Sequence, residues 1–194
     1  MKILVLNGFN PTQQESNRFR NIISKAAELN GFDYEIIDLH TKKIQKCQGC
    51  FDCWVRTPGE CFVQDDSQEI CKRIINCNLL VLLTPIVFGG YSSVLKKMLD
   101  RIIPLISPFF GKYEGEIHHR PRYKKYPNML GVGIHNYSSD EEAACFKKIV
   151  YRNSLNLRSR LTQATTFLNS DSEYFIQNTI NEIFVKMEDK SYAK

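Results

Sequence analysis

The chain has 194 residues, of which 43% are hydrophobic and 24% are charged, and its formal net charge is +5. This is the composition of an ordinary globular chain, and it argues against an intrinsically disordered or collagen-like protein. No apolar run approaches the roughly 20 residues that a membrane-spanning helix needs, so we expect no contact with a membrane.

Short apolar segments alternate with longer segments of helical periodicity. Strands are expected over 2–6, 33–38, 79–83, 129–134 and 164–168. Helices are expected over 16–29, after a cap at Asp65 or Asp66, and over 92–103, 140–157 and 172–187. This order predicts an α/β fold with parallel strands and right-handed crossovers. A doubly wound, five-stranded parallel sheet of order 2-1-3-4-5, with helices on both faces, is the natural result.

Residues 104–127 interrupt the alternation with four of the seven prolines and with Gly111 and Gly115. We interpret them as an excursion from the sheet edge within one domain that covers 1–194. The stretch 112–125 is basic, with five Lys or Arg residues and two Glu residues. A solvated surface is the expected reading of such a stretch. A small anionic ligand would also suit it, and nucleic-acid binding is not favoured.

Two loops follow neighbouring strands at the edge where doubly wound sheets bind ligands, residues 7–17 and 84–91. The first precedes a helix N-terminus, which favours a phosphate, and its Thr12, Ser16 and Asn17 can donate hydrogen bonds. Neither G-x-G-x-x-G nor a P-loop is present, so the phosphate of FMN suits this loop better than a dinucleotide. The alternative is an ordinary helix cap by Ser16 with no ligand.

The second loop has Pro85, then apolar Ile86, Val87 and Phe88, then a glycine pair that starts at Gly89. Glycines allow the main chain to approach a flat ligand closely, and the apolar side chains would cover an isoalloxazine face. An ordinary strand-to-helix turn would explain the same glycines. His135 and Asn136 end the fourth strand at the same edge and are candidates to approach the flavin.

Four cysteines lie close together in a loop with the spacing C-x2-C-x2-C-x7-C: Cys47, Cys50, Cys53 and Cys61. A 4Fe–4S cluster takes four thiolates, and short C-x2-C-x2-C runs supply three of them in ferredoxin loops. Zinc is less favoured because three cysteines at two-residue gaps crowd one ion. Bare thiols or a disulfide, Cys50–Cys53 or Cys47–Cys61, remain the third reading.

The other candidates carry weaker signals. Cys71, Cys77 and Cys145 lie on apolar edges and are expected in the core. Because the cysteine count is odd and no signal segment precedes the first strand, we expect a reducing, cytoplasmic location. Trp54 is expected to pack, or to shield a cluster or flavin. His118 and His119 are expected as surface imidazoles, and Asp100 and Arg101 as a helix-end ion pair.

Four segments together resemble the flavodoxin-like NAD(P)H-dependent FMN reductase family, and within it the iron–sulfur flavoproteins. They are CQGCFDC from Cys47, CFVQDD from Cys61, TPIVFGGYS from Thr84 and LKKMLDR from Leu95. Their order and spacing are similar over residues 1–135. The resemblance implies FMN held by the first loop, including Phe9, Asn10 and Pro11, and by the Pro85 loop. It also implies a homodimer or homotetramer.

These features predict an FMN-dependent oxidoreductase with NAD(P)H as co-substrate, or with electrons from a redox protein. Its acceptor would be a small molecule such as a quinone, a nitro- or azo-aromatic, or free flavin. With a 4Fe–4S cluster present, electrons would pass singly between cluster and FMN. The alternative is a flavodoxin-like module that senses redox state or metal without turnover. Glu15 favours this alternative because it places a negative charge near the expected phosphate. Phe9 favours it because the family's first loop commonly reads G-S-x-R, whereas Gly8 is followed here by Phe9, without the serine or the arginine.

Overall fold

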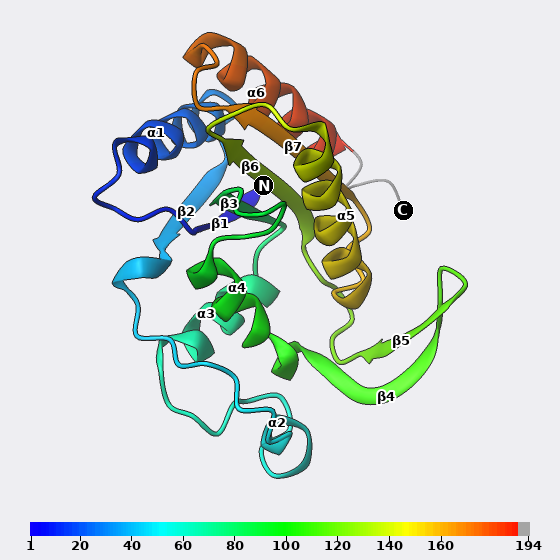
Figure 1. Cartoon of the computed structure of the whole chain (residues 1–194). Coiled ribbons are helices and arrows are strands. Elements are labelled where there is room, and N and C mark those ends of the chain that lie inside the picture. Colours follow the sequence, from blue (N-terminus) through cyan, green and yellow to red (C-terminus); the bar gives the residue numbers. More distant parts are fainter. Residues whose placement is uncertain (190–194) are drawn as a thin grey trace.

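The computed structural model describes residues 1–189 and has a five-stranded parallel sheet at its centre (Figure 1). In spatial order the strands are β2 (Asp33–Asp38), β1 (Lys2–Asn7), β3 (Leu79–Pro85), β6 (Asn128–His135) and β7 (Thr162–Leu168). Every neighbouring pair is parallel. The strand order predicted from the alternation is therefore confirmed.

Helices cover both faces of this sheet (Figure 1). One layer contains α1 (Gln14–Leu29) and α6 (Glu173–Asp189), and the other contains α3 (Asp66–Ile75), α4 (Ser93–Asp100) and α5 (Asp140–Asn156). Alternate residues of β1 supply the two cores: Ile3 and Val5 face α1 and α6, whereas Leu4 and Leu6 face the other layer. Strands β1, β3 and β6 are covered by helices on both faces, so they are apolar almost throughout.

Helix α4 is shorter than its sequence predicts. Ser92 caps its start, with its Oγ accepting from the main-chain N–H of Leu95, but the helix ends at Asp100 and not at Ile103. A short 3-10 turn, η2 (Ile103–Leu105), follows. Pro104 has no N–H to donate to the Asp100 carbonyl, so the α-helical hydrogen bonds cannot continue past this point.

The excursion forms a β-hairpin apart from the main sheet, made of β4 (Ile106–Tyr113) and β5 (Glu116–Pro121). Its tip, Glu114 and Gly115, has φ of 50° and 79°, the signature of a tight two-residue turn. The prolines at 108 and 121 obscured this strand pair in the sequence, because proline cannot donate to a ladder.

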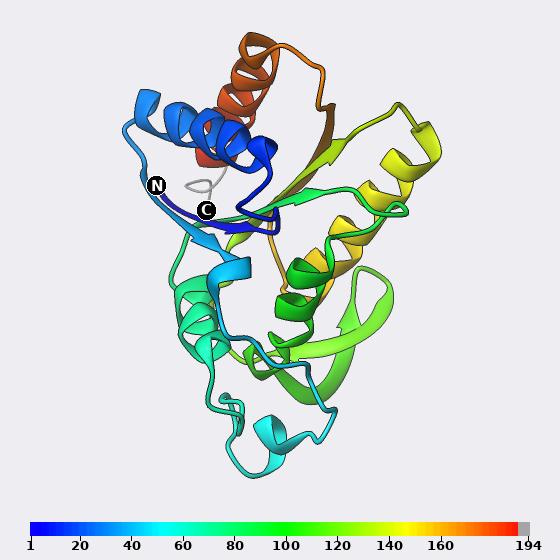
Figure 2. The ribbon, with the colours of Figure 1, turned by 60° about the vertical axis from the view of Figure 1, so that its left-hand side comes forward.

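The cysteine loop (residues 47–61) follows β2 after a 3-10 turn, η1 (Leu39–Thr41), and carries one short helix, α2 (Asp52–Val55). Figure 2 shows this loop extending beyond α3 and α4, on the side away from α1 and α6, with the hairpin at the right of α4. Across the described residues, no helix has the length and apolar character needed to traverse a bilayer.

Candidate functional site

The loops after β1 and β3 meet at the carboxyl edge of the sheet. The N–H of Gly8 donates to the Leu83 carbonyl at 2.8 Å, and the Thr84 hydroxyl accepts from the N–H of Ser92 at 2.9 Å. A Cβ on Gly8 would lie 2.5 Å from the Ser92 Oγ, so glycine is required for this close approach. The structure therefore brings the two predicted ligand loops together.

Two of the predicted residues in the first loop point inward. The Phe9 ring is 3% exposed and stacks on Phe19, with ring centroids 5.8 Å apart. The Ser16 side chain is buried and accepts a hydrogen bond from the Asn7 amide. Only the main chain of Phe9 can reach a ligand in this arrangement.

The remaining predicted residues of that loop are exposed: Asn10, Pro11, Thr12 and Asn17. The Asn10 side-chain oxygen accepts from both the N–H and the hydroxyl of Thr12, at 3.1 and 2.9 Å. The loop is therefore ordered by its own side chains and needs no ligand to hold its shape.

Helix α1 begins without a side-chain cap. Gln13 stands at the N-cap position and makes no capping bond, so the expectation that Ser16 caps this helix is wrong. Within residues 1–189, the main-chain N–H groups of Gln14 and Glu15 have no acceptor outside the helix. The Glu15 carboxylate accepts from the Asn169 amide at 3.1 Å. Free N–H groups at a helix start are suited to a phosphate.

The second loop closes as a tight turn between Val87 and Gly90, which exchange two main-chain hydrogen bonds of 3.1 and 2.9 Å. Phe88 and Gly89, at its tip, both have positive φ, 49° and 70°. The Phe88 side chain is 94% exposed and that of Val87 is 47% exposed. In the described part of the chain, the N–H groups of Phe88 and Gly89 have no acceptor. Pro85 and Ile86 are partly buried beneath this turn.

His135 ends β6 at the same edge and is 5% exposed. Its Nε2 is buried and has no hydrogen-bond partner among the described residues. Its Nδ1 lies 3.7 Å from the Glu142 carboxylate. An unpaired buried ring nitrogen is costly, and a bound ligand with a polar edge would satisfy it.

The donor set at this edge fits FMN. Free N–H groups at the start of α1 suit the phosphate. The polar rim of an isoalloxazine ring could bind the N–H groups of Phe88 and Gly89 and the unpaired Nε2 of His135. The exposed side chains of Val87 and Phe88 would provide apolar cover for such a ring.

The four cysteines of the cysteine loop line one cavity of about 430 Å³, closed on its other side by the end of α4 and residues 153–157. Cys53 is buried, Cys61 is half-buried, and Cys47 and Cys50 are exposed. Burial first, and then the neighbouring thiols of Cys61, Cys47 and Cys50, together raise the pKa of Cys53 to about 11. The sequence spacing therefore does converge on a single site.

The geometry of this loop bears on the interpretations that the sequence left open. All seven cysteines are free, so neither predicted disulfide is present. In the described chain, no three His, Cys, Asp or Glu side chains are placed to hold one metal ion. Four thiols around a cavity suit a multi-iron cluster, which spaces its ligands more widely than one zinc ion does. Phe51 has a φ of 59°, a strained conformation for a residue with a side chain, and such strain is common near ligands, whereas Gly49 adopts its φ of 66° without strain.

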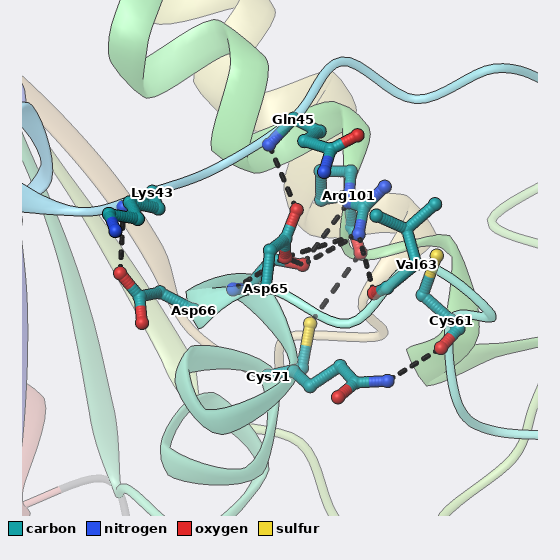
Figure 3. Close-up of polar contacts among 10 residues, drawn as sticks. Lys43, Gln45, Cys61, Val63, Asp65, Asp66, Cys71 and Arg101 are labelled. Atoms are coloured by element: carbon teal, nitrogen blue, oxygen red, sulfur yellow. Dashed lines mark hydrogen bonds and ion pairs between the residues drawn. The ribbon is translucent and has the colours of Figure 1, made fainter.

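A buried ion pair holds the base of the cysteine loop (Figure 3). The Arg101 guanidinium lies 3.2 Å from the Asp65 carboxylate, and the two side chains are 2% and 4% exposed. Arg101 also donates to the Ser67 hydroxyl and the Val63 carbonyl. Burial alone would raise the pKa of Asp65, but hydrogen bonds from Ser67 and Gln45 and the charge of Arg101 outweigh it and lower that pKa.

Side chains at the start of α3 tie both arms of the loop to this pair (Figure 3). Asp65 accepts from the N–H of Gln45 at 2.9 Å, and Asp66 accepts from the N–H of Lys43 at 2.7 Å. The Gln68 amide donates to the Cys61 carbonyl at 2.6 Å. We call Asp65, Asp66, Gln68 and Arg101 the α3 clamp.

The clamp corrects one sequence prediction and extends another. Arg101 pairs with Asp65, not with Asp100, which instead pairs with Lys96 on the exposed face of α4. A helix cap was expected at Asp65 or Asp66, and the structure places it at Asp65, whose Oδ1 accepts from the N–H of Ser67. Nothing in the sequence indicated that the capping carboxylate of Asp65 also forms an ion pair with Arg101.

Trp54 packs between the cysteine loop and the hairpin, as one of its two readings expected. Its Nε1 donates to the Ile106 carbonyl at 3.0 Å, and its ring lies between Phe51 and His119, at centroid distances of 5.3 and 4.9 Å. The prediction of surface imidazoles was wrong: His118 is 7% exposed and His119 is half-buried. The hairpin, which the sequence did not reveal, provides their cover.

The three other cysteines differ in their exposure to solvent. Cys71 and Cys77 are buried as expected, and burial raises the pKa of each to about 12. The prediction was wrong for Cys145, which is exposed on α5. Its Cβ and Sγ lie 2.9 and 3.1 Å from where a Cβ on Gly89 would stand, so glycine lets the second loop pack against α5.

The sequence matches one protein-family model. Residues 1–121 match the family described as NADPH-dependent FMN reductase. This range covers more than half of the chain, including both ligand loops and the cysteine loop, and it ends before His135.

Relatives and solved structures agree with this match. The iron-sulfur flavoprotein MJ1083 of Methanocaldococcus jannaschii is 33% identical over 106 residues, 54% of this chain and 53% of that protein. An iron-sulfur flavoprotein of Archaeoglobus fulgidus is 29% identical over 101 residues, 52% of this chain and 48% of that protein. The chain thus spans about half the length of these relatives.

The NAD(P)H:quinone oxidoreductase from Methanothermobacter marburgensis has a TM-score of 0.69, with 94% of this chain and 96% of that chain covered at 12% identity. At this identity the likeness shows the fold alone.

Proposed function

The chain belongs to the NADPH-dependent FMN reductase family, and on that premise we propose that it is an FMN-dependent oxidoreductase with NAD(P)H as its co-substrate. The acceptor is a small molecule, such as a quinone, a nitro- or azo-aromatic or free flavin, or else a redox protein. One observation supports this most strongly: unpaired polar groups from three separate segments gather at one sheet edge, namely main-chain N–H groups of two loops and a buried ring nitrogen of His135.

The residues of this edge have separate roles in the proposal. The start of α1 binds the phosphate through the N–H groups of Gln14 and Glu15. Val87 and Phe88 cover the ring and exclude water, while the N–H groups of the tight turn bind its polar rim. FMN, when bound, supplies the hydride and electron chemistry, so the protein needs no general acid of its own.

We propose further that Cys47, Cys50, Cys53 and Cys61 hold a 4Fe–4S cluster. The shared cavity supports this, as do the names of the distant relatives. The cluster, when bound, supplies one-electron chemistry. The cavity lies at the C-terminal end of α4 and the Pro85 loop precedes its N-terminal end. Eight helical residues span about 12 Å, so the two sites would be within one short helix of each other.

We propose a homodimer or homotetramer in the cytoplasm. The family resemblance supports the assembly, and the seven free thiols suit a reducing compartment. Nucleic acid and membranes are not partners in this proposal.

The test is anaerobic purification followed by absorption spectroscopy, flavin analysis and iron and sulfide analysis. Stoichiometric FMN, with oxidation of NADPH or NADH in the presence of menadione, is the expected result. Phe88→Ala should weaken FMN binding several-fold and leave the unfolding free energy within about 0.5 kcal/mol, because this side chain is 94% exposed. Protein that retains no flavin after reconstitution contradicts the proposed oxidoreductase.

The cluster has its own matched pair of variants. Cys53→Ser should abolish iron and sulfide binding, whereas Cys145→Ser, an exposed cysteine outside the loop, should retain both. Equal iron content in the two variants contradicts the proposed ligands.

A module that senses redox state or metal without turnover is the second candidate. The exposure of Cys47 and Cys50 favours it, since accessible thiols react readily. Bound metal or reversible thiol oxidation, with no NAD(P)H oxidation under any reconstitution, is the outcome that would select it.

A further inference from the structure

A strongly cationic cleft lies beside the β4–β5 hairpin, apart from both sites above. It has a volume of about 830 Å³, and six cationic side chains line it: Lys112, Arg120, Lys124, Lys125, Arg158 and Arg160. They come from three segments, the hairpin, the connection to β6 and the loop after α5. The cleft is therefore a product of tertiary structure, and only part of it corresponds to the basic stretch 112–125.

These six charges are not compensated within the protein. No carboxylate lines the cleft, and none of the six forms an ion pair with any residue from 1 to 189 that the structure describes. The nearby Glu116 is already engaged by Arg152 at 2.7 Å and by His118 at 3.0 Å. Like charges held together repel, and a multivalent anion would relieve that repulsion.

Arg158 occupies a backbone position where glycine is preferred. It follows the C-cap of α5 and has φ of 50°, a left-handed conformation that is strained for a residue with a side chain. Its guanidinium lies 3.8 Å above the Tyr113 ring, and one terminal nitrogen donates to the His119 carbonyl at 3.0 Å. Its Nε is buried and has no partner in the described chain. Backbone strain and an unpaired side-chain donor in one residue indicate a ligand-binding role.

Arg120 is fixed on the hairpin by a glycine. Its Nε donates to the Phe110 carbonyl at 2.9 Å, and a Cβ on Gly111 would lie 3.3 Å from the same nitrogen. The side chain therefore lies flat on the strand, in a space that any other residue at 111 would narrow. Two guanidinium groups are held by the fold at this cleft, with four more flexible cations at its rim.

We propose that this cleft binds a small polyanion with two or more phosphate groups. Planar guanidinium groups bind phosphate oxygens in pairs, and the lysines add charge without strict geometry. A single small ion would leave most of the volume and charge unused. The half-exposed ring of Tyr123 at the cleft can stack on a base, which would favour a nucleotide over a bare polyphosphate. The proposal does not depend on the flavin or on the cysteine loop.

Isothermal titration calorimetry of the full chain, with its bound cofactors and without divalent cations, tests this with inorganic tripolyphosphate. We expect saturable binding at one site per chain, weakened by added salt. Arg158→Gly should reduce affinity about tenfold or more, because it removes a charge-assisted contact. It also relieves the positive φ, so the variant should fold. Lys147→Gln, an exposed cation of α5 outside the cleft, is the control and should change the affinity less than about twofold.

The second titrant is ATP, in competition with tripolyphosphate. Displacement by ATP, with a further loss of ATP affinity in Tyr123→Ala, identifies a nucleotide source. If ATP displaces tripolyphosphate but Tyr123→Ala binds ATP as tightly as wild type does, the site recognises only the phosphate groups. No saturable binding, or equal affinity in wild type and Arg158→Gly, would overturn the proposal. Binding only to a single-stranded oligonucleotide, with none to tripolyphosphate, would overturn it in favour of a nucleic-acid surface.

Discussion

Removing the charge of Arg101 should destabilise the protein far more than removing a surface charge beside it. In Arg101→Met the Asp65 carboxylate would remain buried, with hydrogen bonds from Ser67 and Gln45 but no counter-charge. Breaking a buried ion pair by deleting one partner costs about 3–5 kcal/mol. We expect a decrease of this size in the free energy of unfolding, measured by urea denaturation at neutral pH.

Asp100→Asn is the matched control, one residue away on the same helix end. Asp100 pairs with Lys96, and these side chains are 48% and 59% exposed. Exposed pairs contribute about 0–1 kcal/mol, so this variant should remain close to wild type. If Arg101→Met lost no more stability than Asp100→Asn, the burial argument for the α3 clamp would be refuted.

A double variant and a pH series extend this test. Asp65→Asn combined with Arg101→Met removes both charges, so its cost should be smaller than the sum of the two single costs by about 2 kcal/mol or more. The pKa of Asp65 is lowered in the folded state, from an ordinary value of 3.8. The stability that it contributes is therefore full above that value and lost as the pH falls through the folded pKa. The gap between wild type and Arg101→Met should close in the same acidic range.

Three further predictions concern other parts of the chain. Gly131→Ala would place a Cβ 2.5 Å from a Val150 methyl, so it should destabilise the protein by about 1–3 kcal/mol in urea, and Val150→Ala should restore part of the loss. In reduced protein without a cluster, iodoacetamide at pH 8 should label the exposed Cys50 well before the buried Cys53, whose pKa is about 11; equal labelling by mass spectrometry would contradict this. Trp54→Phe removes the bond to the Ile106 carbonyl and should cost about 1 kcal/mol, measured by urea unfolding; an unchanged midpoint would show that this bond does not hold the cysteine loop to the hairpin.

The sheet could be predicted from the sequence because its signal is local. The segments ILVL from Ile3 and LLVLL from Leu79 are short and apolar throughout, which is what burial on both faces requires. Their alternation with helical segments leaves one favoured topology, since parallel strands need right-handed crossovers. The spacing of Cys47, Cys50, Cys53 and Cys61 likewise indicated a shared site, because a short loop can direct all four thiols to one place.

Which residues face that edge required the tertiary structure. Phe9 and Ser16 lie in a predicted ligand loop, yet their side chains pack inward, because they follow β1 directly into the core around Phe19. His135 became notable only when its Nε2 proved to be buried and unpaired. The orientation of a loop side chain depends on neighbours distant in sequence, and local pattern carries little information about them.

Local sequence was enough to predict the α/β topology, the meeting of the loops after β1 and β3, and the grouping of four cysteines, because each depends on residues near one another in the chain. The contacts of Arg101 with Asp65, and the placement of Arg158 near Arg120, became visible only in the folded protein, because these residues lie 36 and 38 positions apart. Charges so far apart in sequence meet only when the packing of helices and sheet has been settled by the apolar residues. The hydrophobic cores therefore fix the frame, and the positions of the buried charges follow from it.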